Sequence, residues 1–295
     1  MPSSKPSCLK NPKPLFFILP LITILICGCG FKEEQLYSKD EAERKFVQIC
    51  KDEYNWDVNT KLIGNTFWIY IPYQQDILQF KVNRFPQISK FAVASLKGNF
   101  LNKTLYFEYQ IAPLVKSEED KGFTNALVDK VNEDFYHLLN VIYRVYFNAQ
   151  QQPEFYVIVI ADITNGIEII YTIYNDDLKK AYNDAIASEE YYKRILQDIR
   201  GSPTIINDKT GRHLTYNKID LGQFLAQQIV QRIRIKFLGG DSELLKVTQE
   251  KISDEILKII SYCLGAYEFQ DFSMVILEDL STGNQITKDP SSLYP

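Results

Sequence analysis

The chain has 295 residues, of which 45% are hydrophobic and 24% are charged, and its formal net charge is −4. This composition supplies enough apolar material for a sizeable core, so an intrinsically disordered chain is excluded. The acidic balance disfavours nucleic acid as a partner, because proteins that bind nucleic acid carry an excess of Lys and Arg on the binding face.

The N-terminus contains an apolar run, residues 15–26, that follows a basic stretch. A helix needs about 20 apolar residues to cross a bilayer, and this run is too short. Lys5, Lys10 and Lys13 precede it without any acidic residue, and small residues follow it. The order of basic, apolar and small residues is typical of a secretory signal.

The end of this run resembles the signal of bacterial lipoproteins, whose lipobox has an aliphatic residue three positions before the modified cysteine and a small residue directly before it. Ile26, Cys27, Gly28 and Cys29 fill these positions. The resemblance implies acylation of Cys29, and the acyl chains would hold the protein on a membrane without a spanning helix. Gly30, rather than Asp, resembles the sorting signal for the outer membrane, with the protein facing the periplasm. A plain signal peptide and an uncleaved anchor are the alternatives.

The predicted mature chain begins at Cys29 and retains two further cysteines, Cys50 and Cys263. Each lies in an apolar helical pattern, which favours a buried thiol, although an exported protein also permits a disulfide between them. The spacing of Cys and His residues matches no metal site, so we expect neither a metal nor another cofactor.

Three segments combine a helical pattern with two strand-like runs around a short turn. Apolar residues recur at helical spacing in 39–54, 124–150 and 242–266. The strand-like runs that follow predict hairpins that turn at Gly64-Asn65, Asn165-Gly166 and Gly283-Asn284.

The second and third of these segments are similar to each other. "FYVIVIADITNG" begins at residue 155 and "FSMVILEDLSTG" at residue 272, and the two match in kind at an offset of 117 (272 minus 155). We therefore predict an α+β fold with antiparallel sheets, packed helices and a duplicated helix-plus-hairpin unit. Chance similarity between amphipathic strands is the alternative.

The pattern divides the chain into five regions: a signal peptide (1–28), a tether (29–38), an N-terminal α+β region (39–115), a central unit (116–210) and a C-terminal unit (211–295). Alternation in residues 104–111 predicts further strands, and residues 175–199 and 220–237 read as helices. Turn-forming residues predict a surface loop over 200–218.

Candidate site residues are few. Trp68 and Tyr70 share one face of a predicted strand, where they would present an aromatic surface to a partner. A helix covering that face is the alternative. Asp162 and Asp279 precede two of the turns, where they would form paired carboxylates for a cation or substrate, or remain solvated. His213 lies among turn-forming residues, so we expect it to be solvated and dispensable.

No recognisable catalytic motif is present, and the chain has two histidines. We therefore expect a lipid-anchored protein of the bacterial cell envelope that acts as a non-enzymatic binding or assembly module. Its partners would be the membrane, through acylated Cys29, and another envelope protein or a glycan. An envelope hydrolase with an unrecognised site is the alternative.

Overall fold

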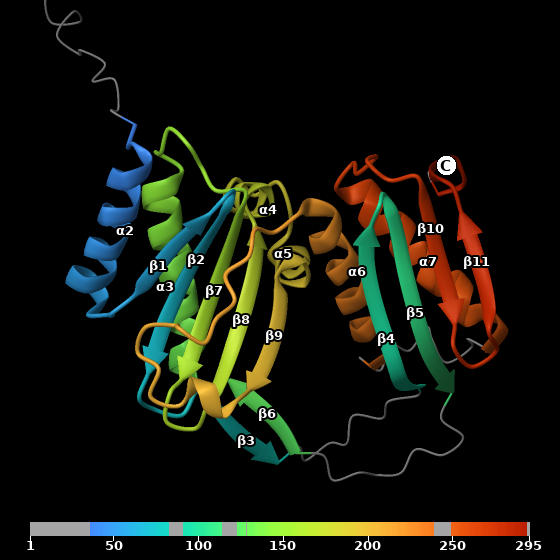
Figure 1. Ribbon diagram of the computed structural model, residues 1–295, viewed down its shortest axis with the longest axis horizontal. Helices are drawn as coiled ribbons and strands as arrows, with labels where there is room; N and C mark the ends of the chain where they lie inside the picture. The colour runs from blue at the N-terminus through green and yellow to red at the C-terminus, as the bar shows by residue number, and fades with distance from the viewer. Residues whose placement is uncertain (1–35, 83–90, 114–122, 128, 239–248, 294–295) are drawn as a thin grey trace, which may run out of the picture. The chain divides into compact units, whose positions relative to one another are not determined.

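The structure, a computed structural model, describes residues 36–82, 91–113, 123–127, 129–238 and 249–293 (Figure 1). Helices and mixed sheets pack together, so the predicted α+β class is confirmed. The predicted signal peptide and Cys29 lie outside the described residues.

A five-stranded sheet forms the first core. Its strands, in spatial order, are β1 (Asn59–Ile63), β2 (Thr66–Tyr73), β7 (Phe155–Asp162), β8 (Ile167–Tyr174) and β9 (Leu196–Gly201). β2 and β7 are parallel, and the other neighbours are antiparallel. Apolar side chains of α2 (Lys39–Tyr54) and α3 (Asp129–Tyr146) pack on one face of this sheet. All eight residues of β7 are buried, which requires cover on the other face as well.

A four-stranded sheet forms the second core. Its strands, in spatial order, are β11 (Asn284–Lys288), β10 (Met274–Asp279), β5 (Thr104–Pro113) and β4 (Phe91–Leu101). β5 and β10 are parallel. Buried side chains of α6 (Leu221–Leu238) and α7 (Gln249–Ala266) complete this core.

The two cores repeat one arrangement. Each contains a hairpin, then helical structure, then a second hairpin, and the strand order β1-β2-β7-β8 corresponds to β4-β5-β10-β11. The predicted helix-plus-hairpin units are confirmed by α3 with β7–β8 and by α7 with β10–β11. The helix expected over 124–150 begins only at Asp129, because residues 124–127 belong to strand β6 (Phe123–Leu127), and residues 242–248 of the helix expected over 242–266 lie outside the described residues. The sheets are mixed rather than wholly antiparallel, because in each core one strand of the first hairpin pairs in parallel with one strand of the second.

The hairpin turns differ from the prediction in detail. Gly64 and Asn65 form the expected two-residue turn between β1 and β2. The β7–β8 loop has four residues, 163–166, of which only Gly166 has positive φ, at 71°. The β10–β11 loop, 280–283, likewise ends on a glycine with positive φ, Gly283. The two-residue turn predicted at Asn165-Gly166 is therefore wrong.

Two other expectations need correction. The helix predicted over 175–199 divides into α4 (Asn175–Tyr182), α5 (Ser188–Arg194) and strand β9, with Asp184 at a positive φ of 54° between the helices. The predicted regions also do not follow the sheets, since β4 and β5 join β10 from the far end of the chain. A separate pair of strands, β3 (Leu78–Val82) and β6 (Phe123–Leu127), lies on either side of this insertion.

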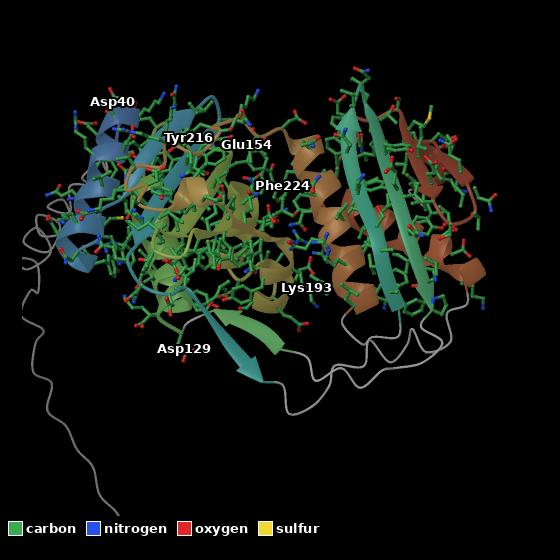
Figure 2. All side chains as sticks on the ribbon, turned by 60° about the horizontal axis from the view of Figure 1, so that its bottom comes forward. Asp40, Asp129, Glu154, Lys193, Tyr216 and Phe224 are labelled. Carbon is green, nitrogen blue, oxygen red and sulfur yellow. The ribbon has the colours of Figure 1, made fainter. Side chains whose placement is uncertain are left out.

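Polar contacts join α4 and α5 to α6 and to the residue that follows α7. Arg194 on α5 contacts Asp177 on α4 at 2.7 Å, and the Tyr267 hydroxyl donates to the same carboxylate at 2.5 Å. Glu190 on α5 receives Arg232 from α6 at 2.6 Å. These contacts fix α6 beside the first sheet, and Figure 2 shows Phe224 on α6. The ring of Phe224 lies 5.3 Å from that of Phe155 on β7.

Candidate functional site

Residues 202–220, which we call the strap, cross the face of the first sheet that α2 and α3 leave uncovered (Figure 1). Three contacts fasten the strap to β2. The Tyr70 hydroxyl donates to the Asp208 carbonyl at 2.5 Å, and Trp68 Nε1 donates to the Asn217 carbonyl at 3.0 Å. The backbone N–H of Ile219 donates to Thr66 Oγ1 at 2.8 Å. The strap, rather than a helix, thus covers the aromatic face of β2.

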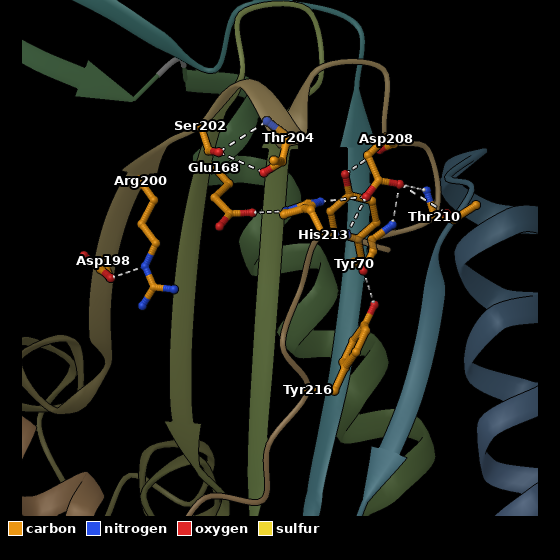
Figure 3. A network of polar contacts seen from close by, with 11 residues as sticks. Tyr70, Glu168, Asp198, Arg200, Ser202, Thr204, Asp208, Thr210, His213 and Tyr216 are labelled. Atoms are coloured by element: carbon orange, nitrogen blue, oxygen red, sulfur yellow. Dashed lines mark hydrogen bonds and ion pairs between the residues drawn. The ribbon is translucent and has the colours of Figure 1, made fainter.

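His213 connects the strap to the sheet through both nitrogens of its ring (Figure 3). Nδ1 lies 2.7 Å from Asp208 Oδ2 on the strap, and Nε2 lies 2.7 Å from Glu168 Oε2 on β8. The side chains of His213, Asp208 and Glu168 are 8%, 11% and 5% exposed, respectively. We call Asp208, His213 and Glu168 the clamp.

The electrostatics of the clamp favour a positively charged imidazole. Burial alone would lower the pKa of His213, but the hydrogen bonds to Glu168 and Asp208 outweigh burial and raise this pKa above its ordinary value of 6.5. Burial would raise the pKa of Asp208, but hydrogen bonds from His213 and Thr210 hold it well below its ordinary range. Because an ionised carboxylate can only accept hydrogen bonds, both contacts of the ring are satisfied when each nitrogen carries a proton, and neither nitrogen then keeps a lone pair to accept another.

The expectation that His213 is a solvated loop residue is wrong. The turn-forming sequence around it was correctly identified, and Lys209 and Arg212 are exposed. The backbone of this loop nevertheless turns the imidazole inward, since the N–H groups of Thr210, Gly211 and His213 all donate to the Asp208 carboxylate. An inward cation is tolerated because two carboxylates receive it.

Beside the strap, the same face of the sheet forms the floor of a cavity of about 780 Å³, which we call the groove. Its floor includes Val157, Ile170, Thr172 and Leu196 of the sheet. Its walls are formed by Trp68 and the strap, by the β4–β5 turn and by the N-terminal half of α6; residues from these walls include Leu101, Asn102, Leu214, Asn217, Gln223, Phe224 and Gln227.

Besides His213, four charged side chains line the groove, and they have distinct roles. Asp220 accepts from the backbone N–H of Gly222 at 2.9 Å and so caps the start of α6. Arg200 donates from Nε to Asp198 at 2.7 Å, and its side chain is 60% exposed. Lys218 is exposed. Glu168 uses Oε2 to bind His213, and its second oxygen, Oε1, has no hydrogen-bond partner among the residues that the structure describes.

The structure separates the two aromatic residues predicted as a binding surface. Trp68 lines the groove, with its ring 5.3 Å from that of Tyr216 in an edge-to-face arrangement. Tyr70 is 1% exposed beneath the strap and meets the ring of His213 at 5.7 Å. An open aromatic face that includes Tyr70 is therefore wrong, because strap residues cover it.

Asp162 and Asp279 do not form a shared site. Asp162 accepts from the backbone N–H groups of Thr164 and Asn165, and Asp279 accepts from that of Ser281. The two acids end strands of different sheets, where each stabilises its own hairpin loop. Across the described residues, no group of three or more His, Cys, Asp or Glu side chains is arranged to hold a metal ion.

Cys50 and Cys263 are both free and buried, as their apolar surroundings predicted. They lie in different cores, and burial raises the pKa of each thiol to about 12. A disulfide between them is excluded in this structure, and neither thiol is activated as a nucleophile.

Glu168 is the functional residue that the sequence analysis missed. It is the one charged residue in the strand "IEIIYTIY", and a charge in a buried strand requires a partner. That requirement was the available signal, although it does not identify His213, which is 45 positions away in the chain.

Comparison with protein-family models, with curated proteins and with solved structures finds no match to this chain. Within the described parts of the chain, no helix combines the length and the apolar character needed to cross a membrane. The functional inference therefore depends on the geometry of the clamp and the groove.

Proposed function

We propose that this chain is a lipid-anchored protein of the bacterial cell envelope and that it acts as a non-enzymatic binding module whose ligand occupies the groove. The observation that carries this proposal is the double hydrogen bonding of His213. A general base must present a free lone pair to its substrate, whereas both nitrogens of His213 are directed at carboxylates. The remaining groove residues are largely apolar, hydroxyl or amide side chains, which suit binding.

The anchor in this proposal is supported by the lipobox-like residues Ile26 to Cys29. Labelled palmitate should enter the wild-type protein and be absent from Cys29→Ser. Cys27→Ser is the matched control and should retain the label. Label that survives in Cys29→Ser would contradict acylation at this residue.

An envelope hydrolase is the second candidate, because Glu168 and His213 both line the groove. The two functions differ in what they require of His213. Arg at this position keeps a cation between the two carboxylates but cannot serve as a base near neutral pH, since its pKa exceeds 12. A binding module should tolerate this change, whereas a hydrolase that uses His213 should not.

The experiment compares variants in cells in which deletion of the gene gives an envelope defect. His213→Arg should restore the wild-type phenotype, whereas Gln223→Trp, which places a large ring in the groove, should not. Lys251→Trp on the exposed surface of α7 controls for the added tryptophan. Failure of a folded and tethered His213→Arg variant, with success of Gln223→Trp, would favour the hydrolase.

A further inference from the structure

We propose that the ligand of the groove is a neutral oligosaccharide. This inference rests on the proposed function, because it names the ligand class for the same groove. The occupant is inferred from three features of the groove: a floor whose backbone is already paired, an available carboxylate oxygen with Arg200 as its cross-strand neighbour, and apolar and aromatic surface beside planar amides.

The floor is the face of a sheet rather than its edge. Val157 on β7 and Ile170 on β8 lie in strands with hydrogen-bonded neighbours on both sides, so their backbone groups are used within the sheet. An extended peptide that adds to a sheet requires a free strand edge. Recognition on this floor must come from side chains, which favours a ligand with many hydrogen-bonding groups of its own.

The charges of the groove favour a neutral ligand. Glu168 Oε1 has no partner among the described residues, and Glu168 lines the groove, so this oxygen can accept a hydrogen bond from a ligand. Arg200 and Lys218 line the same groove and oppose a cationic ligand, while the carboxylate of Glu168 opposes an anionic one. A hydroxyl group satisfies both, because it donates to the carboxylate and accepts from a cation.

The remaining surface matches the two kinds of surface on a sugar ring. Trp68 provides aromatic surface and Leu196 provides aliphatic surface, both partly exposed, against which the C–H groups of a pyranose can pack. Asn102 adds a planar amide that both donates and accepts hydrogen bonds, and Gln223 adds amide N–H donors, since its Oε1 already accepts from the backbone N–H of Phe100 at 3.3 Å. The volume of about 780 Å³ is within the range of small-molecule sites and leaves room for more than one sugar ring.

Calorimetric titration of the full chain with tetra-N-acetylchitotetraose and with maltotetraose tests this proposal. The protein should be purified in a detergent without a sugar headgroup, so that the detergent does not compete. We expect saturable binding of at least one of these neutral tetrasaccharides by the wild type. Binding should weaken at least tenfold in Glu168→Gln, where the amide can still receive His213 but turns an N–H group toward the ligand in place of an acceptor oxygen.

Asp208→Asn is the matched control, because it removes a carboxylate charge from the same clamp but lies outside the groove lining. It should bind the sugar within about threefold of the wild type. Gln223→Trp gives a second test that leaves the clamp intact, and it should abolish binding in a folded protein. Its Tm should change little, because the side-chain hydrogen bond of Gln223 that it removes, from the backbone N–H of Phe100, is exposed and 3.3 Å long.

Two results would overturn the oligosaccharide proposal: a folded wild type that binds neither sugar, or equal weakening by Glu168→Gln and Asp208→Asn with Gln223→Trp still binding. Either result leaves the binding module standing if Gln223→Trp still fails to restore the envelope phenotype. Loss of function in His213→Arg, by contrast, would remove the proposed function itself.

Discussion

Replacement of His213 by Ala should destabilise the protein strongly, because it removes the cation that two buried carboxylates share. Asp208 would keep its hydrogen bonds from the loop backbone at residues 210 and 211, so the main cost falls on Glu168, whose side chain is 5% exposed. Breaking a buried ion pair by removing one partner costs about 3–5 kcal/mol. Because Asp208 keeps its hydrogen bonds from the loop backbone, we expect a loss at the lower end of this range, about 3 kcal/mol.

Urea denaturation followed by circular dichroism measures this change in the free energy of unfolding. A loss of about 3 kcal/mol corresponds to a fall in Tm of roughly 6–12 °C for a chain of this size. His137→Ala is the control, since the side chain of the other histidine is 38% exposed and its contact with Glu133 on the helix surface is 3.6 Å long. That variant should lose less than about 1 kcal/mol.

A loss below about 1 kcal/mol in His213→Ala would refute this reasoning. It would mean that the strap is held by its backbone contacts to β2 alone. The pH at which the measurement is made matters, because the clamp depends on the charge of the imidazole. Measurements near pH 6 keep His213 protonated, since its pKa is raised above 6.5 in the folded protein.

Three further predictions concern the clamp and the glycines. Because the pKa of His213 is raised in the folded protein, the stabilisation by its charge is complete below pH 6.5 and is lost as the pH rises through the folded pKa. In urea titrations the wild type should therefore lose stability relative to His213→Arg between pH 6.5 and 9. Parallel stability curves for the two proteins would contradict this. Gly98→Ala should lower Tm, because a Cβ at this position would lie 2.9 Å from a backbone carbonyl oxygen of α6. Gly265→Ala has open space around it and should instead stabilise the protein by about 1 kcal/mol, because Ala favours the helical conformation of α7. Equal shifts in Tm would be inconsistent with this packing. Gly166→Val should lower Tm more than Gly283→Val. Both glycines have positive φ, but only at Gly166 would a Cβ lie 2.8 Å from a backbone oxygen. The opposite order of the two Tm values would rule this out.

Much of the local structure follows from periodicity in the sequence. The helical spacing of residues 39–54 and the Gly64-Asn65 turn predicted α2 and the first hairpin at their observed positions. The similarity of residues 155–166 to 272–283 correctly indicated two related hairpins. Helices and hairpin turns are determined mainly by residues close together in the sequence, so a local sequence pattern can predict them.

The pairing of strands and the clamp could not be predicted in this way. Nothing in residues 104–113 indicates that this strand pairs with residues 274–279 rather than with β2, because both choices bury the same apolar residues. His213 reads as a loop residue, and its partner Glu168 is brought to it by the path of the strap across the sheet. The groove likewise combines side chains from four separate segments of the chain.

The protonation state of His213 is the most direct test of the account, because the clamp and the non-enzymatic function both depend on it. The measurement is the ¹⁵N NMR spectrum of the protein labelled at histidine, recorded at pH 7, with His213→Arg used to assign the signals. The account predicts that Nδ1 and Nε2 of His213 both carry protons, each held in a hydrogen bond to a carboxylate. A neutral imidazole with one unprotonated nitrogen open to the groove would contradict the account and would restore His213 as a candidate base.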